Sequence, residues 1–325
     1  RRLRDGSFKS IALFQLAGPI GGILVALAAM AIMRNIWVIV IVTIGTSIFR
    51  VIGSHIVAEN RFRFRISREH TRDIVRFGLP LLAAGLMFWA NSQSDKIVMF
   101  LGERYESIPV FTDAEIGSYG TVAGMVLLPR GIFVTVMQSV FIPQIAQARG
   151  DAVRLRRKFA QAVAGTTGLS LLIVLGGQLA GESVFVLVLG ESYRIGASVA
   201  PLLLAAMGTQ LLRTISYESS IAMGKTSVTF VGNTVRLISI PISIVLLSKG
   251  YGVIGLAWSV YIGEIVSTLA AVAWLQATTI RHSWMILLGL VITLASTYAF
   301  RQIGDAMSEL DDLARVLILM SIYTL

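Results

Sequence analysis

The chain has 325 residues, of which 55% are hydrophobic and only 14% are charged, and its mean hydropathy of +0.77 exceeds what the core of a soluble domain needs. The formal net charge of +10 does not indicate nucleic-acid binding, because the Lys and Arg residues cluster in short segments between long apolar runs. With no cysteine and three scattered histidines, the sequence offers no disulfide framework, no thiol nucleophile and little for a metal ion. We therefore expect a protein of the lipid bilayer, with no cofactor and no nucleic-acid partner.

Hydrophobic runs long enough to cross a bilayer recur along the whole chain. The candidate spans, about ten in number at roughly 20 residues each, lie at 11–33, 36–58, 76–101, 116–140, 159–180, 195–213, 227–248, 252–275, 283–300 and 313–325. Only helices satisfy their own backbone hydrogen bonds in lipid, and the runs lack the alternation of barrel strands. The sequence predicts an all-α polytopic helix bundle. Because the chain begins in a basic run and ends in an apolar one, we also expect it to be part of a longer protein.

Short loops that are rich in basic residues predict which side of the membrane they occupy. The strongest marker is the segment 59–76, and a second basic loop, 149–158, precedes the fifth span. The loops at 103–115 and 305–312 are acidic instead. We expect the basic segments to be cytoplasmic and the acidic loops to face outward.

Several short motifs occur in an order that is typical of one transporter family. RFGLPL at 76–81, followed by SDK at 94–96, resembles the start of the second lobe in the polysaccharide or O-antigen flippases of the multidrug/oligosaccharidyl-lipid/polysaccharide (MATE-like) exporter superfamily. GSYG at 117–120 is similar to the family's G-x-Y turn, and Pro129 with Pro143 resembles its paired-proline span. The segment 187–193 resembles its short re-entry before a helix.

The resemblance implies a two-lobe transporter that lacks its first helices. Residues 1–58 would be the last two helices of the N-terminal lobe, 59–76 a basic cytoplasmic linker, 77–275 the C-terminal six-helix lobe, and 276–325 an extra helix pair whose last member may be cut short. Similar helix openings at 35–38 and 251–258 fit two parallel repeats, although any two hydrophobic hairpins look alike. A chain without the first helices is not expected to transport alone.

The resemblance further implies a bacterial inner-membrane flippase for polyprenyl-pyrophosphate-linked oligosaccharide, acting by alternating access in polysaccharide or lipopolysaccharide biosynthesis. A polysaccharide polymerase or ligase would be its partner. Three alternatives stay open: a multidrug or cation antiporter of the same superfamily, an integral-membrane enzyme of polysaccharide synthesis, and a structural scaffold. The sequence contains no P-loop, nucleophile elbow or H-E-x-x-H motif, so we expect no enzymatic activity and no catalytic residues.

Ionisable residues inside membrane spans are costly and often functional. Those in the candidate spans are Arg50, His55, Asp95, Lys96, Arg130, Arg213, Glu218, Arg236 and Glu264. Arg130 follows Pro129 about halfway along its span, and a guanidinium can hold a phosphate through two hydrogen bonds. Arg130 is therefore the leading candidate for binding pyrophosphate, and the alternative is a structural pair with a buried carboxylate such as Asp95.

The remaining candidates lie on three spans. Asn91 and Asp95 are four residues apart, so they share a helix face that we expect to line a cavity, where Asp95 would bind substrate or a coupling proton or sodium ion. Lys96 either contacts substrate or snorkels outward.

Arg236 and Glu264 belong to adjacent spans of one hairpin, so a structural ion pair between them is the simplest expectation. Arg236 is kept as a substrate-binding candidate and Glu264 as an ion-coupling one. Arg213, Glu218 and Lys225 flank an expected cytoplasmic turn and are predicted to anchor the helices at the membrane interface.

Overall fold

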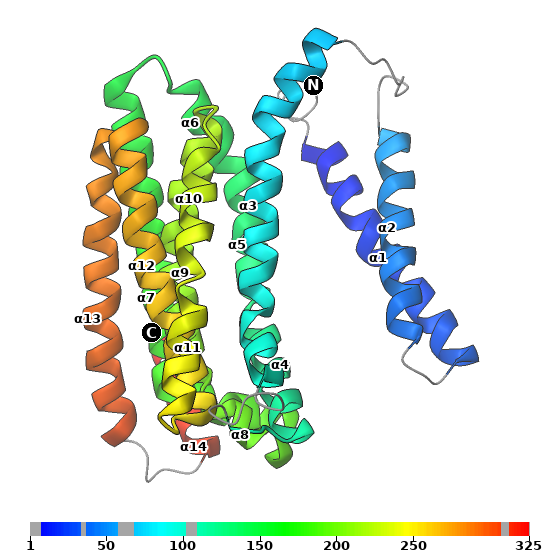
Figure 1. Cartoon of the computed structure of the whole chain (residues 1–325), viewed down its shortest axis with the longest axis vertical. Coiled ribbons are helices and arrows are strands. Elements are labelled where there is room, and N and C mark those ends of the chain that lie inside the picture. Colours follow the sequence, from blue (N-terminus) through cyan, green and yellow to red (C-terminus); the bar gives the residue numbers. More distant parts are fainter. Residues whose placement is uncertain (1–7, 34–36, 58–67, 102–108, 307–311, 325) are drawn as a thin grey trace. The chain divides into compact units, whose positions relative to one another are not determined.

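The chain is helical in every part that the structure describes. This computed structural model describes residues 8–33, 37–57, 68–101, 109–306 and 312–324, and no strand occurs in these ranges. The helices form two compact units, Arg1–Thr71 and Arg72–Leu325 (Figure 1). The all-α prediction is confirmed. The basic run at the start of the chain, the arginines between 58 and 67, and most of the two acidic loops lie outside the described residues.

The first unit is a hairpin of α1 (Phe8–Ile32) and α2 (Trp37–Val57). Small residues let the two helices approach closely, which is a common way of packing helices in lipid. A Cβ atom added at Gly21 would lie 2.1 Å from the Phe49 side chain, so any larger residue there would push the helices apart.

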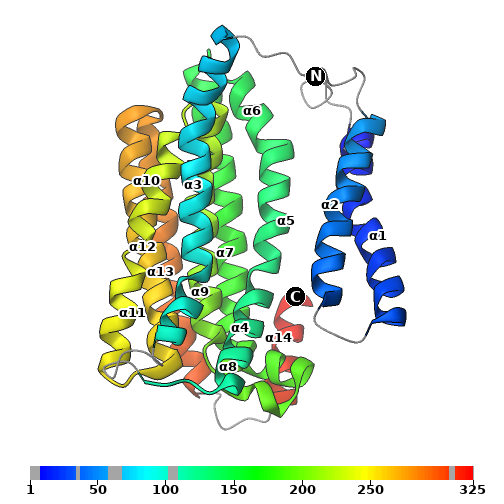
Figure 2. The same cartoon turned by 45° about the vertical axis from the view of Figure 1, so that its right-hand side comes forward.

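The second unit contains the remaining elements. In chain order these are α3 (Arg68–Leu101), α4 (Asp113–Val126), α5 (Leu128–Val136), η1 (Met137–Phe141), α6 (Ile142–Gln147), α7 (Ala152–Leu189), η2 (Glu191–Tyr193), α8 (Arg194–Ala197), α9 (Ala200–Ala222), α10 (Ser227–Arg236), α11 (Ser239–Ser248), α12 (Gly252–Thr278), η3 (Arg281–Ser283), α13 (Trp284–Ala306) and α14 (Asp312–Thr324). Figures 1 and 2 show the long helices of this unit running roughly parallel, with α8 and α14 at the same end of the bundle.

Helix α9 is the centre of this bundle. It packs against α7, α12 and α13, and every residue from 205 through 220 is buried. Helix α9 approaches α7 closely because residue 177 of α7 is glycine, which leaves room for Leu204. A Cβ atom added at Gly177 would lie 2.7 Å from the Leu204 Cβ. A helix that is buried on all sides can carry polar groups only if its neighbours satisfy them.

Several of the expected spans are broken helices. Pro129 and Pro143 occupy the first turns of α5 and α6, where the missing N–H of proline is tolerated, and the π-helical turn η1 lies between these helices. The break between α10 and α11 precedes Pro241, which cannot donate the bond that would continue the helix. The motif predicted a turn at the GSYG segment, 117–120. That prediction is wrong, since the segment lies inside α4.

Each of the expected spans overlaps a helix or a broken helix, but fewer helices than predicted are long and apolar enough to cross a membrane. Among the described residues five helices meet both conditions, or six if the pair η2–α8 and α9, bent by 48°, counts as one span. Parts of α1, α2 and α14 are shorter apolar helices. The protein is therefore a multi-pass membrane protein, and the described residues support five or six of the approximately ten expected spans.

A buried arginine network as candidate functional site

The polar side chains of α9 meet those of α10 and α12 in the middle of the bundle. Glu264 on α12 forms ion pairs with two arginines. Its Oε1 is 2.7 Å from Arg236 Nε, and its Oε2 is 2.7 Å from Arg213 Nη2. The side chains of Arg213 and Glu264 are each only 2% exposed. Since Oε2 accepts no aligned hydrogen bond from the described residues, its contact with Arg213 is mainly electrostatic. One carboxylate thus neutralises part of the charge of two buried guanidinium groups.

Nη1 of Arg213 is surrounded by oxygen atoms, whereas Nε is buried without a hydrogen-bond partner among the described residues. Nη1 donates to the Tyr217 hydroxyl at 2.5 Å, to Ser267 Oγ at 3.1 Å and to Asn233 Oδ1 at 3.2 Å. These partners come from α9, α12 and α10, so the guanidinium fixes three helices at one point. Such a set of interactions offsets part of the large desolvation cost of a buried arginine.

Asn91 connects this network to α3. Its amide donates to the Asn233 carbonyl at 2.8 Å, and the Asn233 amide donates to the Ala84 carbonyl at 3.0 Å. Both asparagines are buried. The polar face of α3 that the sequence predicted therefore points into the bundle rather than toward lipid.

A small cavity of about 50 Å³ opens beside the network. Asn91, Asp95, Arg236 and Glu264 line it together with Gln210. Asn91 Oδ1, Gln210 Nε2 and Glu264 Oε2 are buried without a hydrogen-bond partner in the part of the chain that the structure describes. A space of this size holds a few water molecules or an ion, but not a lipid headgroup with its sugars.

Arg130 lies on α5, outside this cavity. Its guanidinium carbon is 4.6 Å from the centre of the Phe88 ring, a cation–π contact, and its Nε is buried with no hydrogen-bond partner among the described side chains. The charges of Arg213, Arg236 and Glu264 all act on it. The alternative in which Arg130 pairs with Asp95 is not realised among the described residues, since the described ion pairs do not include it.

The structure brings together four of the predicted residues and separates two. Asn91, Asp95, Arg236 and Glu264 share the small cavity, and the expected pair between Arg236 and Glu264 is confirmed. Arg130 lies within electrostatic range of that cluster. Lys96 does not line the cavity. Its side chain lies near Gly120 on α4 instead.

The prediction that Arg213 and Glu218 anchor the helix at the membrane interface is wrong. They are 1% and 5% exposed, because α9 is surrounded by other helices along most of its length. Glu218 accepts from Gln138 Nε2 at 3.3 Å and interacts with the charge of Arg130. The signal that could have found them is the spacing of Gln210, Arg213 and Tyr217, which recurs every three or four residues and so gives the helix one polar face that neighbouring helices must satisfy.

A family model described as "Polysaccharide biosynthesis protein" matches residues 2–197. The chain belongs to this family. The matched part of this polysaccharide biosynthesis protein contains Asn91, Asp95 and Arg130, whereas Arg213, Arg236 and Glu264 lie beyond it. The family expected from the sequence motifs is thereby confirmed.

A solved structure supports the same fold for this member of the polysaccharide biosynthesis family. The chain is similar to "Lipid II flippase MurJ, inward closed conformation", with a TM-score of 0.60 and 17% sequence identity. The similarity covers 95% of this chain and 64% of that one, so the chain spans less than two thirds of the flippase's length. No curated protein matches the chain.

Proposed function

We propose that this protein moves a polyprenyl-pyrophosphate-linked oligosaccharide across the bacterial inner membrane by alternating access. The family match and the flippase-like fold support transport of a lipid-linked substrate. The observation that carries the proposal further is Arg130, a partly buried residue whose Nε is buried without a hydrogen-bond partner among the described residues. A pyrophosphate that entered beside α5 would supply the acceptors that this group lacks. A polysaccharide polymerase or ligase would then use the translocated substrate.

The small cavity also bears on the mechanism. At about 50 Å³ it cannot admit the substrate, so contact of the substrate with Asn91, Asp95 or Arg236 would require the helices around the cavity to separate. Asp95 is a better candidate for ion coupling than Glu264, because Glu264 already contacts two arginines while Asp95 forms no ion pair among those that the structure records. A proton or sodium ion at Asp95 would change the charge balance of the cavity between the two states.

A cation exporter is the second candidate, and one observation favours it. The arginines of the cluster, Arg130, Arg213 and Arg236, are matched in number by Asp95, Glu218 and Glu264. These six residues therefore carry no excess of positive charge. The two candidate functions require ligands of opposite charge, so a binding experiment separates them.

The test compares the purified full-length wild-type protein with Arg130→Ala in detergent. We expect a polyprenyl-pyrophosphate oligosaccharide to bind the wild type and to bind Arg130→Ala about tenfold more weakly, which corresponds to about 1.4 kcal/mol. Arg157→Ala is the matched control, because it removes an exposed arginine on α7 that belongs to neither the arginine network nor the small cavity. Binding of a lipophilic cation in place of the pyrophosphate lipid would reject the flippase proposal in favour of an exporter.

A further inference from the structure

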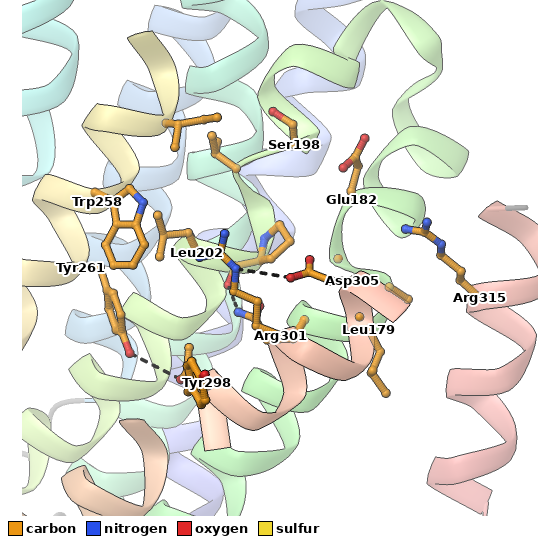
Figure 3. A pocket seen from close by; sticks show the side chains of 18 of the residues that line it. Leu179, Glu182, Ser198, Leu202, Trp258, Tyr261, Tyr298, Arg301, Asp305 and Arg315 are labelled. Carbon is orange, nitrogen blue, oxygen red and sulfur yellow. Dashed lines mark hydrogen bonds and ion pairs between the residues drawn. The ribbon is translucent and has the colours of Figure 1, made fainter. Parts of the chain in front are cut away.

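A much larger cavity lies near the end of the bundle where α8 and α14 meet. Its volume is about 760 Å³, within the range of small-molecule sites, roughly 300–1,000 Å³. Residues of α7, α9, α12, α13 and α14 line it, and none of the residues of the arginine network is among them (Figure 3). The proposed transport function therefore does not account for it.

Part of this cavity is a mostly apolar slot between α12 and α13, crossed by a hydrogen bond from the Tyr261 hydroxyl to Thr297 Oγ1 at 3.4 Å. These helices follow each other in the chain, but α12 packs mainly on α9 and α13 mainly on α7, and they contact each other little. Trp258 and Tyr261 of α12 form one wall, and Leu294 and Tyr298 of α13 belong to the other. Because α7, α12 and α13 are long and apolar enough to cross a membrane, acyl chains are the apolar material that surrounds the slot.

The mouth of the cavity is ionic, and some of its charges are already paired. Arg194 contacts Glu182 at 3.2 Å, Glu191 at 2.7 Å and Asp312 at 3.0 Å. The Ser183 hydroxyl donates to Asp312 at 2.7 Å and, together with Arg194, lowers the pKa of the Asp312 carboxyl below its ordinary value. The Asp312 carboxylate is therefore ionised at neutral pH, and its two oxygens already have Ser183 and Arg194 as partners.

Two other arginines at the mouth are available. Arg301 Nε is 3.9 Å from Asp305 Oδ2, and both side chains are more than half exposed, so the pair is loose and contributes little. Arg315 Nε is buried without a hydrogen-bond partner among the described residues, and Figure 3 shows its side chain extending from α14 toward the cavity. The mouth thus offers guanidinium donors and, at Asp305, a carboxylate acceptor.

These features restrict the charge of a ligand. The acidic residues that line the cavity, Glu182, Asp305 and Asp312, are equal in number to the arginines, Arg194, Arg301 and Arg315. A headgroup with only negative charge would leave the exposed Asp305 carboxylate without a cationic partner from the ligand, whereas a headgroup that carries both signs would find a partner for each.

We propose that the cavity binds a phospholipid with a zwitterionic aminophosphate headgroup, phosphatidylethanolamine. Its phosphodiester accepts hydrogen bonds from Arg301 and Arg315, its ammonium donates to Asp305, and one acyl chain fills the slot over Trp258. The ammonium matters because three N–H donors can reach a carboxylate, which the methylated amine of phosphatidylcholine cannot do. The lipid would hold α13 and α14 against the bundle.

Native mass spectrometry of the full-length protein tests this proposal. Delipidated protein in detergent is mixed in turn with phosphatidylethanolamine, phosphatidylcholine and phosphatidylglycerol of identical acyl chains. We expect the first lipid to be retained at least fivefold more than either of the others. Stronger retention of phosphatidylglycerol would overturn the assignment of a zwitterionic headgroup, and equal retention of all three would show non-selective surface lipid only and overturn the site.

Variants locate the binding site on the protein. Arg301→Ala combined with Arg315→Ala should reduce the retained phosphatidylethanolamine about tenfold, and Leu294→Trp, which fills the slot, should reduce retention of any lipid in the cavity. Arg157→Ala is the control for loss of a basic residue, and thermal unfolding in detergent checks that each variant is folded. Arg130→Ala should leave phospholipid retention unchanged, so failure of the transport proposal would not be confused with failure of this one. Unchanged retention in the folded Arg301/Arg315 double variant would overturn the proposal.

Discussion

At the scale of single residues, the chemistry of the bundle centres on Glu264. This carboxylate lies between Arg213 and Arg236 and is almost completely buried. Removing one partner of a buried ion network leaves a charge without compensation, whereas replacing the whole network by apolar groups of similar size is tolerated much better. The network is therefore sensitive to single substitutions.

The variant Glu264→Gln should lose roughly 3–5 kcal/mol of stability, because two buried guanidinium groups would remain without a counter-charge. Denaturant-induced unfolding in detergent, followed by tryptophan fluorescence, measures the effect. The triple variant Arg213→Met, Arg236→Met and Glu264→Met should recover most of the loss. If Glu264→Gln were as stable as the wild type, the carboxylate would not be the counter-charge that the geometry indicates.

At the scale of helices, the close contact between α7 and α9 positions the buried network. Ser170 Oγ donates to the Gly208 carbonyl at 2.8 Å, and Gly177 faces Leu204. Small residues and hydrogen bonds of this kind hold membrane helices together where the hydrophobic effect does not. A shift of α9 would move Arg213 away from its partners on α10 and α12.

Gly177→Val should therefore destabilise the protein by about 1–3 kcal/mol, since its Cβ would lie 2.7 Å from Leu204 Cβ. The matched control is Gly165→Val, the same substitution in the same helix at an exposed position with no atom within 4 Å of the added Cβ. The thermal midpoint in detergent is the measurement. Equal effects of both variants would mean that the cost comes from helix propensity rather than from the contact with α9.

At the scale of the second unit, α7 is long enough to reach from one side of the membrane to the other. A rise of about 1.5 Å per residue puts Arg156 and Gln178 roughly 33 Å apart along this helix, close to the bilayer's hydrocarbon thickness of about 30 Å. Gln178 lines the large cavity together with Asp305. The basic segment near Arg156 and the acidic residues at the cavity mouth therefore lie at opposite ends of α7.

Cysteine labelling tests the predicted orientation, because the chain contains no cysteine of its own. In intact cells a membrane-impermeant maleimide should label Asp305→Cys from outside and should label Arg156→Cys only after permeabilisation. Both native residues are exposed, so access through the protein does not limit the reaction. The opposite labelling pattern would reverse the topology derived from the basic loops.

Much of the fold could be predicted because membrane insertion depends on local composition. The apolar runs around α7, α12 and α13 correctly indicated helices, and the pairing of Arg236 with Glu264 followed from their places on neighbouring spans. The GSYG segment was misassigned because glycine is compatible with a turn, whereas the capping box of Thr112 and Glu115 starts a helix that continues through it.

The sequence by itself determined that this is an all-helical membrane protein with ionisable side chains inside its spans, because hydrophobicity and backbone hydrogen bonding are properties of each segment alone. Only the tertiary structure decided that Arg213 joins the expected pair of Arg236 and Glu264. Arg213 and Glu264 come together because α9 is enclosed by α7, α12 and α13, and this arrangement depends on small residues that permit close helix contacts. The same packing leaves the slot between α12 and α13 open, which no local pattern in the sequence predicts.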